Sequence, residues 1–220
     1  MRRVLRDNAL SITMFAIFLV TWVGMSIAGY LNGNSDNAAH HQPHESYARY
    51  VGSGAFAEAT FENWESEFLQ LAGYVLFTAF LVQRGSPESK RPSGVPSDAD
   101  PREHRDEPDV PWPVRRGGFA LLVYEHSLTL ALGSLFLLSF VGHALGGHVE
   151  YNQQQLEHGE QPVSLWGFVT SSAFWFQSLQ NWQSEFLAVG ALAVLGIFLR
   201  ERGSPESKPV AAPHDETGSG

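Results

Sequence analysis

Long apolar blocks alternate with strongly polar connections along the chain, and four of the blocks predict membrane-spanning helices. Residues 9–31 hold no charged side chain, and residues 127–147 hold only His143 as an ionisable group. Residues 68–82 and 186–199 are shorter, and each reaches the roughly 20 residues that cross a bilayer only if the preceding Trp is included. The predicted spans are about 9–31, 64–83, 126–148 and 182–200, with Trp64 and Trp182 as interfacial anchors.

The first block has two interpretations, a secretory signal or an uncleaved helix. Arg2, Arg3 and Arg6 precede it, and residues 26–28 (Ser-Ile-Ala) form an acceptable cleavage site. However, its apolar run is longer than a normal signal core, and the third block, which matches it, cannot be an N-terminal signal. We therefore expect an uncleaved helix.

An internal repeat organises the sequence. A shift of 118 residues aligns residues 7–90 with 125–208 without a gap, and 28 of the 84 aligned positions are identical. Asn-Trp-x-Ser-Glu-Phe-Leu recurs at 63–69 and 181–187, and Arg-Gly-Ser-Pro-Glu-Ser-Lys recurs from Arg84 and Arg202. Because each copy holds two crossings, both copies have one orientation, which predicts an all-α membrane protein built as a tandem parallel repeat of a two-helix hairpin.

The repeat also sets the expected domain boundaries. The polar residues 85–118, rich in Pro, Ser, Asp and Arg, are typical of a flexible linker between the copies. The predicted parts are a first repeat at 1–84 with an outer loop at 32–63, the linker at 85–118, a second repeat at 119–202 with an outer loop at 149–181, and a disordered tail at 203–220.

Charge predicts the orientation and excludes one class of partner. Of the 14 Lys and Arg residues, only Arg49 falls in the two hairpin loops. The positive-inside rule therefore predicts a multi-pass protein of the bacterial inner membrane with both termini and the linker in the cytoplasm. A net charge of −9 argues against nucleic acid as a partner, because phosphate binding needs a basic surface.

The two outer loops contain aromatic-rich segments. Residues 164–179 are uncharged and rich in Phe and Trp, and residues 46–61 are a weaker copy. Such segments lie in the membrane interface as short helices or dip into the bilayer as re-entrant elements, and we expect the interfacial form.

The most specific motif places a glutamate, Glu67 or Glu185, about one turn inside each Trp. One interpretation is a symmetric acidic pair that binds a cation or relays protons, because a carboxylate at that depth usually finds a partner or water. The other is helix initiation, in which Asn, Ser and Glu satisfy free backbone amides of the first turn. The motif residues concerned are Asn63, Ser66, Asn181 and Ser184.

The second predicted helix carries a polar stripe at helical spacing. Asn63, Glu67, Gln70, Tyr74 and Thr78 lie on one face, which must contact other helices or water within a membrane. The stripe indicates interhelical hydrogen bonding or a conduction path. It is not repeated in the fourth predicted helix beyond its first turn.

Small residues recur four apart in the first and third predicted helices. Gly24 and Ala28 align with Gly142 and Gly146. Small residues let helix backbones approach closely, so we expect a seam between these two helices or between two copies of the chain.

Evidence for metal or catalytic chemistry is weak in this sequence. His40, His41 and His44 cluster in the first outer loop, but metal sites need three or four converging ligands. Cysteine is absent, and no nucleotide-binding or hydrolase motif occurs. An enzyme using His143 and a carboxylate would lack any recognised spacing. We predict no metal, no cofactor and no enzymatic activity.

The duplicated Asn-Trp-x-Ser-Glu-Phe-Leu and Arg-Gly-Ser-x-Glu-Ser-Lys elements resemble an uncharacterised family of short bacterial membrane proteins, a domain of unknown function. The resemblance implies a bacterial plasma-membrane setting and no particular activity. We therefore expect a structural or interaction protein that forms a helical bundle or homo-oligomer in the lipid bilayer. The alternative is a small transporter or channel in which Glu67 and Glu185 bind a cation or proton.

Overall fold

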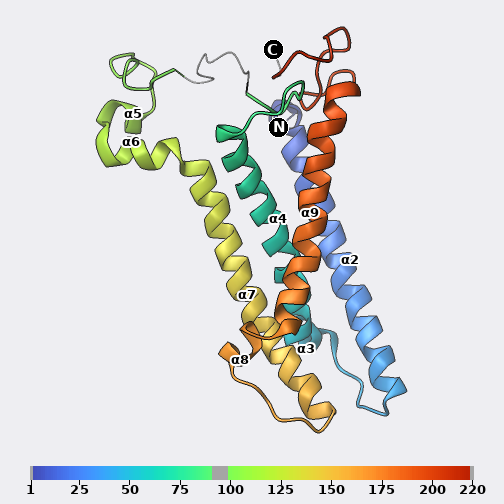
Figure 1. Ribbon diagram of the computed structural model, residues 1–220. Coiled ribbons are helices and arrows are strands. Elements are labelled where there is room, and N and C mark those ends of the chain that lie inside the picture. The colour runs from blue at the N-terminus through green and yellow to red at the C-terminus, as the bar shows by residue number, and fades with distance from the viewer. Residues whose placement is uncertain (1, 91–98, 219–220) are drawn as a thin grey trace. The chain divides into compact units, whose positions relative to one another are not determined.

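The computed structural model describes residues 2–90 and 99–218, and within these ranges the regular structure is entirely helical (Figure 1). Four helices are long and five are short. In chain order they are α1 (Arg2–Asp7), α2 (Ala9–Ala39), α3 (Tyr47–Val51), α4 (Gly54–Phe80), α5 (Trp112–Arg116), α6 (Gly118–Glu125), α7 (Ser127–Glu157), α8 (Leu165–Val169) and α9 (Ser172–Phe198).

The helix bounds follow the 118-residue period of the sequence. Adding 118 to the first and last residue of α2, α3 and α4 gives the bounds of α7, α8 and α9. Aligned positions therefore adopt the same secondary structure, although about two thirds of the aligned residues differ.

The bounds of the long helices differ from those of the predicted spans. α2 and α7 continue to Ala39 and Glu157, and α4 and α9 begin at Gly54 and Ser172. α4 starts early because the Ser53 hydroxyl oxygen accepts a hydrogen bond from the backbone N–H of Phe56, at 3.2 Å, as a helix cap does. The loops predicted at 32–63 and 149–181 are correspondingly shorter, and each contains one short helix, α3 or α8.

Three helices of the described ranges, α2, α7 and α9, are long and apolar enough to cross a membrane. α4 is as long as α9, with 27 residues, but it is less apolar. Its first half carries four glutamates, Glu58, Glu62, Glu65 and Glu67.

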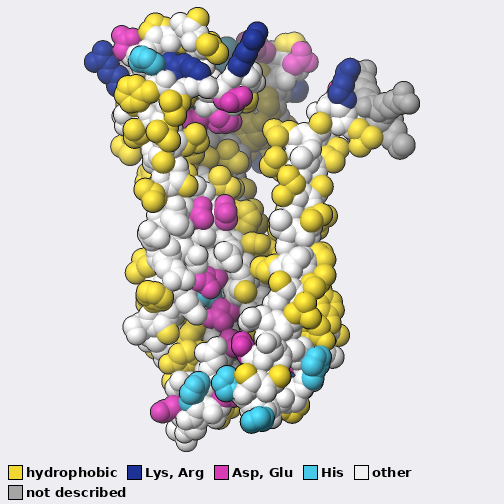
Figure 2. All heavy atoms as spheres, turned by 90° about the vertical axis from the view of Figure 1, so that its right-hand side faces the viewer, with side chains coloured by type: hydrophobic (Ala, Val, Ile, Leu, Met, Phe, Trp, Pro, Cys, Tyr) yellow, Lys and Arg dark blue, Asp and Glu magenta, His cyan; other side chains and the backbone are white. Residues whose placement is uncertain are grey.

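Large hydrophobic side chains cover the outer faces of these helices. Leu10 and Val20 of α2 are 74% and 73% exposed, and Leu187 of α9 is 70% exposed. Figure 2 shows hydrophobic side chains over much of the surface of the long helices. Extensive exposed apolar surface of this kind is unusual for a soluble monomer and suits contact with lipid.

The chain divides into two units, Met1–Phe61 with Gly142–Ser171, and Glu62–Val141 with Ser172–Gly220. In the first unit the core is aromatic. Phe56 and Phe168 are buried, and the Trp22 and Phe56 rings lie 5.9 Å apart. Tyr30 packs edge-on against Tyr47, at 5.5 Å between ring centroids. These contacts fix α3 and α8 against the long helices of that unit.

One asparagine in each copy closes the loop of its hairpin. The Asn34 side chain accepts from the backbone N of Glu45, at 2.7 Å, and donates to its carbonyl oxygen, at 3.1 Å. Asn152, 118 residues later, makes the same two bonds to Val163, at 2.8 and 3.0 Å. Because asparagine satisfies both backbone groups of one residue, it holds the loop at a fixed point.

The second unit includes the C-terminal segment, where the sequence predicts a disordered tail and where several hydrogen bonds occur within residues 203–218. Lys208 is buried, and its ammonium group donates to three backbone carbonyl oxygens at 3.0–3.1 Å. Thr217 then accepts a hydrogen bond from the backbone N of Gly85, at 2.8 Å. The polar composition that suggested disorder instead supplies these contacts. The three carbonyls belong to Pro213, His214 and Glu216.

Candidate functional site

The duplicated Asn-Trp-x-Ser-Glu-Phe-Leu motif lies in the middle of α4 and α9 and not at their beginnings. The Ser66 hydroxyl donates to the carbonyl of Asn63, and the Ser184 hydroxyl donates to that of Asn181, each at 2.8 Å. Such bonds to the preceding turn are typical of serine within a helix. The helix-initiation interpretation of the motif is therefore wrong, because the free amides of α4 lie about ten residues earlier, at Gly54.

α4 and α9 join through polar contacts of this motif. The Trp182 indole N–H donates to Glu65 Oε1 at 2.8 Å, and the Asn181 amide donates to Glu62 Oε1 at 2.5 Å. Further along, the Gln70 amide donates to the backbone carbonyl of Glu185 at 3.2 Å. Glu65 is completely buried. Trp182, predicted as an interfacial anchor, thus has its polar group inside the α4–α9 contact.

Glu67 of α4 and Glu185 of α9 interact electrostatically. The charge of Glu185 acts on the Glu67 carboxyl group, so the two side chains lie within electrostatic reach of each other. Neither carboxylate has a side-chain hydrogen bond or ion pair among the described residues. The structure therefore brings together the two glutamates that the repeat makes equivalent.

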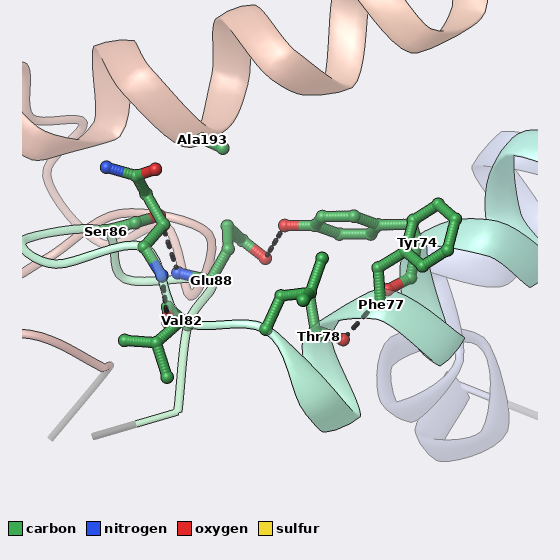
Figure 3. Close-up of a pocket in the computed structure, with 10 residues that line it drawn as sticks. Tyr74, Phe77, Thr78, Val82, Ser86, Glu88 and Ala193 are labelled. Carbon is green, nitrogen blue, oxygen red and sulfur yellow. Dashed lines mark hydrogen bonds between the residues drawn. The ribbon is translucent and has the colours of Figure 1, made fainter. Parts of the chain in front are cut away.

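The polar stripe of α4 continues from this pair toward the end of the helix. Tyr74 donates its phenolic hydrogen to Glu88 Oε2 at 3.0 Å, and the Thr78 hydroxyl donates to the backbone carbonyl of Tyr74 at 3.0 Å (Figure 3). Both side chains border a cavity of about 250 Å³, which Ser86 and Glu88 of the following loop and Ala193 of α9 also line. Apart from Glu88, Gln83 and the residues with hydroxyl groups, the lining side chains are apolar.

Glu88 is the residue that the sequence-based reasoning missed. It belongs to the heptapeptide that recurs unchanged in both copies, and its equivalent is Glu206. Glu206 lies within electrostatic reach of the Glu88 carboxyl group. Burial, above all, raises the pKa of Glu88, and the neighbouring Glu206 raises it further, whereas the bond from Tyr74 opposes the rise. The unbroken identity of the heptapeptide was the signal that could have indicated this residue.

The two heptapeptide loops have the same internal hydrogen bonds. Ser86 and Ser204 each accept from the backbone N of the glutamate two residues later, at 3.3 and 3.2 Å. Ser89 and Ser207 each accept from a backbone N six residues earlier, at 2.8 and 2.9 Å. Each loop also needs its glycine, since the φ angles of Gly85 and Gly203 are 86° and 88°. The repeated residues thus build one loop twice.

The small residues predicted to form a seam have different environments. A Cβ on Gly146 would lie 2.8 Å from the Cβ of Ala57, and one on Gly142 would meet the Phe61 ring, so α7 packs closely against the start of α4. A Cβ on Gly24, the equivalent of Gly142, would meet no described atom within 4 Å, and its partner Ala28 lies on the same helix, α2. The seam expected between the first and third predicted helices therefore forms between α7 and α4.

The histidines take part in local structure. His148 Nε2 lies 2.9 Å from the carbonyl oxygen of Val163, beside the Asn152 side chain, and His143 is completely buried. Over residues 2–90 and 99–218, no three His, Asp or Glu side chains lie together as a group able to hold a metal ion.

Comparison with known proteins identifies the chain only at the level of a family. No curated protein and no solved structure gives a significant match to it. Residues 1–219, by contrast, match a family described as a domain of unknown function, DUF6766. Because the match covers nearly the whole chain, both copies of the repeat and the loops between them lie within it, and the chain belongs to the DUF6766 family.

Proposed function

We propose that the chain is a four-span protein of the bacterial inner membrane that moves protons or small cations along the α4–α9 helix pair. The distribution of Lys and Arg supports an orientation with both termini in the cytoplasm. The period shared by the helix bounds supports a parallel repeat in which α4 crosses the membrane in addition to α2, α7 and α9. The proposal assigns no catalytic chemistry to the chain.

The glutamates of α4 are compatible with a membrane-spanning position for this helix, because side chains of α9 donate hydrogen bonds to two of them. Glu62 and Glu65 accept hydrogen bonds from Asn181 and Trp182. A polar side chain inside a bilayer faces the bundle interior and finds a partner there. The glutamates that make α4 less apolar would therefore also hold α4 against α9 within the bilayer.

The observation that carries the proposal is the pairing of Glu67 with Glu185. The charge of Glu185 acts on the Glu67 carboxyl group, and the two residues occupy equivalent positions of the two copies. Like charges at short range repel, and a proton or cation held between them removes that repulsion. An intramembrane pair of this kind commonly marks an ion or proton pathway.

The stripe of α4 supplies a continuation of that pathway. Gln70, Tyr74 and Thr78 follow Glu67 at helical spacing, and each offers a hydroxyl or amide group. Tyr74 contacts Glu88 in the loop beyond α4. Groups able to exchange hydrogen bonds thus extend from the glutamate pair to the end of the helix that we assign to the cytoplasmic side.

Transport can be measured with the purified protein in liposomes. We expect the wild-type chain to dissipate a proton or potassium gradient and the double variant Glu67→Gln, Glu185→Gln to reduce the flux to that of empty liposomes. Glu160→Gln, which changes an exposed loop glutamate, is the matched control and should leave the flux unchanged. Equal flux from the wild-type chain, the double variant and empty liposomes would overturn the proposal.

The orientation is tested separately with reporter fusions. Alkaline phosphatase inserted within residues 149–163 should be active, because that loop is assigned to the outer side, whereas a fusion after residue 218 should be inactive. The reverse pattern would contradict the proposed topology while leaving the helix contacts intact.

A second candidate, a structural or interaction protein that associates with itself, rests on a different observation. Gly24 and Ala28 of α2 form a small-residue pair, and Gly24 has open space beside it in the described structure. A second copy of the chain could pack there. Gly24→Leu should then convert an oligomer to a monomer in detergent, as measured by light scattering, whereas an unchanged mass would exclude this surface.

A further inference from the structure

We propose that the cavity bordered by the end of α4, the first heptapeptide loop and α9 binds a small organic cation, a primary ammonium group carried on a compact apolar body. Glu88 would hold the ammonium group, and apolar side chains of the two helices would cover the rest of the ligand. The inference does not depend on transport, because binding at this cavity requires no passage across a membrane.

The cavity has the size and lining of a site for a small molecule. Its volume is about 250 Å³, the space of about eight water molecules at roughly 30 Å³ each. Phe77, Leu81 and Val82 supply an apolar wall, and Ala193 lies on the side formed by α9 (Figure 3). Ligand sites commonly combine such an apolar lining with a few placed polar groups.

Glu88 is the one charged side chain among the ten residues described as lining the cavity. Its Oε2 atom accepts the phenolic hydrogen of Tyr74 at 3.0 Å, and the two side chains point toward one another (Figure 3). An ionised carboxylate has about four acceptor positions on its two oxygens. The bond from Tyr74 therefore fixes the carboxylate and leaves acceptor capacity for a ligand.

The hydroxyl groups of the lining favour a ligand that donates hydrogen bonds. Thr78 donates its hydrogen to backbone carbonyl oxygens of its own helix, at 3.0 and 3.1 Å. Ser89 donates to the carbonyl oxygen of Lys90, at 3.2 Å, and Tyr74 donates to Glu88. Because a hydroxyl group has one hydrogen, these three groups can only accept further bonds. An ammonium group, with three donors and no acceptor, is complementary to them.

The charge around Glu88 favours a cation. None of the ten lining residues is Lys, Arg or His, and within residues 2–90 and 99–218 Glu88 forms no ion pair. Lys90 of the same loop donates to the carbonyl oxygen of Ala79 instead. Burial raises the pKa of Glu88, and the charge of Glu206 raises it further against the opposing bond from Tyr74. A bound ammonium group would stabilise the ionised carboxylate, whereas an anionic group would be repelled.

The loop that carries Glu88 is held by contacts within the protein. The Ser86 hydroxyl accepts from the backbone N of Glu88 at 3.3 Å, and the Ser86 carbonyl accepts from the backbone N of Gly218 at 2.9 Å. A Cβ on Gly196 would lie 3.1 Å from Pro87 Cδ, so the loop packs directly on α9. A site that is formed in advance has a smaller entropic cost of binding.

Binding is measured by isothermal titration calorimetry on the full chain in a non-ionic maltoside detergent, with benzylammonium chloride as the probe. We expect saturable binding of benzylammonium. Benzyl alcohol, its neutral counterpart, should bind about 10-fold more weakly or worse, because hydrogen bonds to charged groups are the stronger ones. Equal affinity for the two compounds, or no saturable binding of benzylammonium, would overturn the proposal.

A pair of equivalent glutamates separates the site from the general charge of the surface. Glu88→Gln should weaken benzylammonium binding by about 10-fold or more. Glu206→Gln is the matched control, because it removes the same charge from the equivalent position of the second loop, at an exposed residue outside the described lining. It should change the affinity by about fivefold at most. Unchanged affinity in Glu88→Gln, or equal losses in the two variants, would refute the assignment.

A variant on α9 tests the cavity without changing any charge. Ala193→Leu places a larger side chain in the cavity wall and should reduce benzylammonium binding even if Glu88→Gln folds poorly. Full affinity in Ala193→Leu would mean that the probe binds elsewhere, which would also overturn the proposal. The titration uses no ion gradient, so its outcome is independent of the liposome flux and the two proposals can fail separately.

Discussion

Trp182 of α9 donates its indole N–H to the completely buried carboxylate of Glu65 on α4, 2.8 Å away. The two residues come from different copies of the repeat. The equivalent of Glu65 in the second copy is Gln183, so the contact is not duplicated in the same form. Divergence between the copies has thus produced a specific bond that joins them.

Removing the donor tests how much this bond contributes. Trp182→Phe keeps the apolar ring and deletes the N–H, which leaves the buried Glu65 oxygen without that partner. We expect a loss of about 1–3 kcal/mol in the free energy of unfolding, measured in detergent. Trp166→Phe is the control, because Trp166 is 76% exposed and should change stability little. Equal effects of the two changes would show that the bond contributes nothing.

Two glycines of the small-residue pairs, Gly146 in α7 and Gly24 in α2, should respond to alanine in opposite directions. In Gly146→Ala the new methyl group would meet the Cβ of Ala57 and the backbone N of Glu58 at 2.8 Å, so α7 must move away from α4. We expect a loss of about 1–3 kcal/mol from this overpacking. Gly24→Ala meets open space and should gain about 0.5–1 kcal/mol from helix propensity. Thermal unfolding of the two variants in one detergent makes the comparison, and destabilisation by both would contradict it.

The sequence predicted the long helices well because apolar runs are a local property. It placed the start of α4 too late because residues 54–63 contain glutamates that look like a polar loop. It placed the start of α9 too late because residues 164–179 were assigned to an interfacial segment of the outer loop. Glu62 is in fact satisfied by Asn181, 119 positions away. A partner so distant in sequence cannot be read from local composition.

The candidate site was predictable in part. Repeat equivalence alone paired Glu67 with Glu185, and the charge of Glu185 acts on the Glu67 carboxyl group in the structure, while a role of the pair in binding a cation or proton stays a prediction. The sequence did not indicate Glu88, because the role of a glutamate in a polar loop depends on the residues that fold against it, here Tyr74. Likewise, Gly24 and Gly142 share one sequence pattern, and only the packing distinguishes them.

The contact between Gly29 and Tyr50 offers a test by compensation. A Cβ on Gly29 would collide with the Tyr50 hydroxyl group, so Gly29→Ala should destabilise the chain. In the second copy the equivalent pair is Gly147 and Phe168, where no hydroxyl is present. Tyr50→Phe should therefore recover part of the loss, but not all, because the ring carbon next to the hydroxyl would still lie 2.9 Å from the new Cβ. Additive unfolding free energies for the two changes would refute the collision.

The C-terminal segment should detach when its internal cation is removed. Lys208 is buried and donates to three carbonyl oxygens, so Lys208→Met keeps the side-chain length but leaves those carbonyls without their donor. We expect amide hydrogen exchange over residues 209–218 to accelerate by about 10-fold to 100-fold, the equivalent of about 1.4–2.8 kcal/mol. Gly85 should exchange faster as well, because its N–H donates to Thr217.

Lys90→Met is the matched control for that exchange experiment, because Lys90 occupies the same position in the first heptapeptide. Its ammonium group donates to one carbonyl, that of Ala79, and not to three. Its loss should therefore leave protection of residues 209–218 unchanged. If both lysine variants accelerate exchange equally, the effect is one of total charge, and the order of the C-terminal segment does not depend on the buried ammonium group. A selective effect of Lys208→Met instead means that one repeated lysine has acquired a separate structural role.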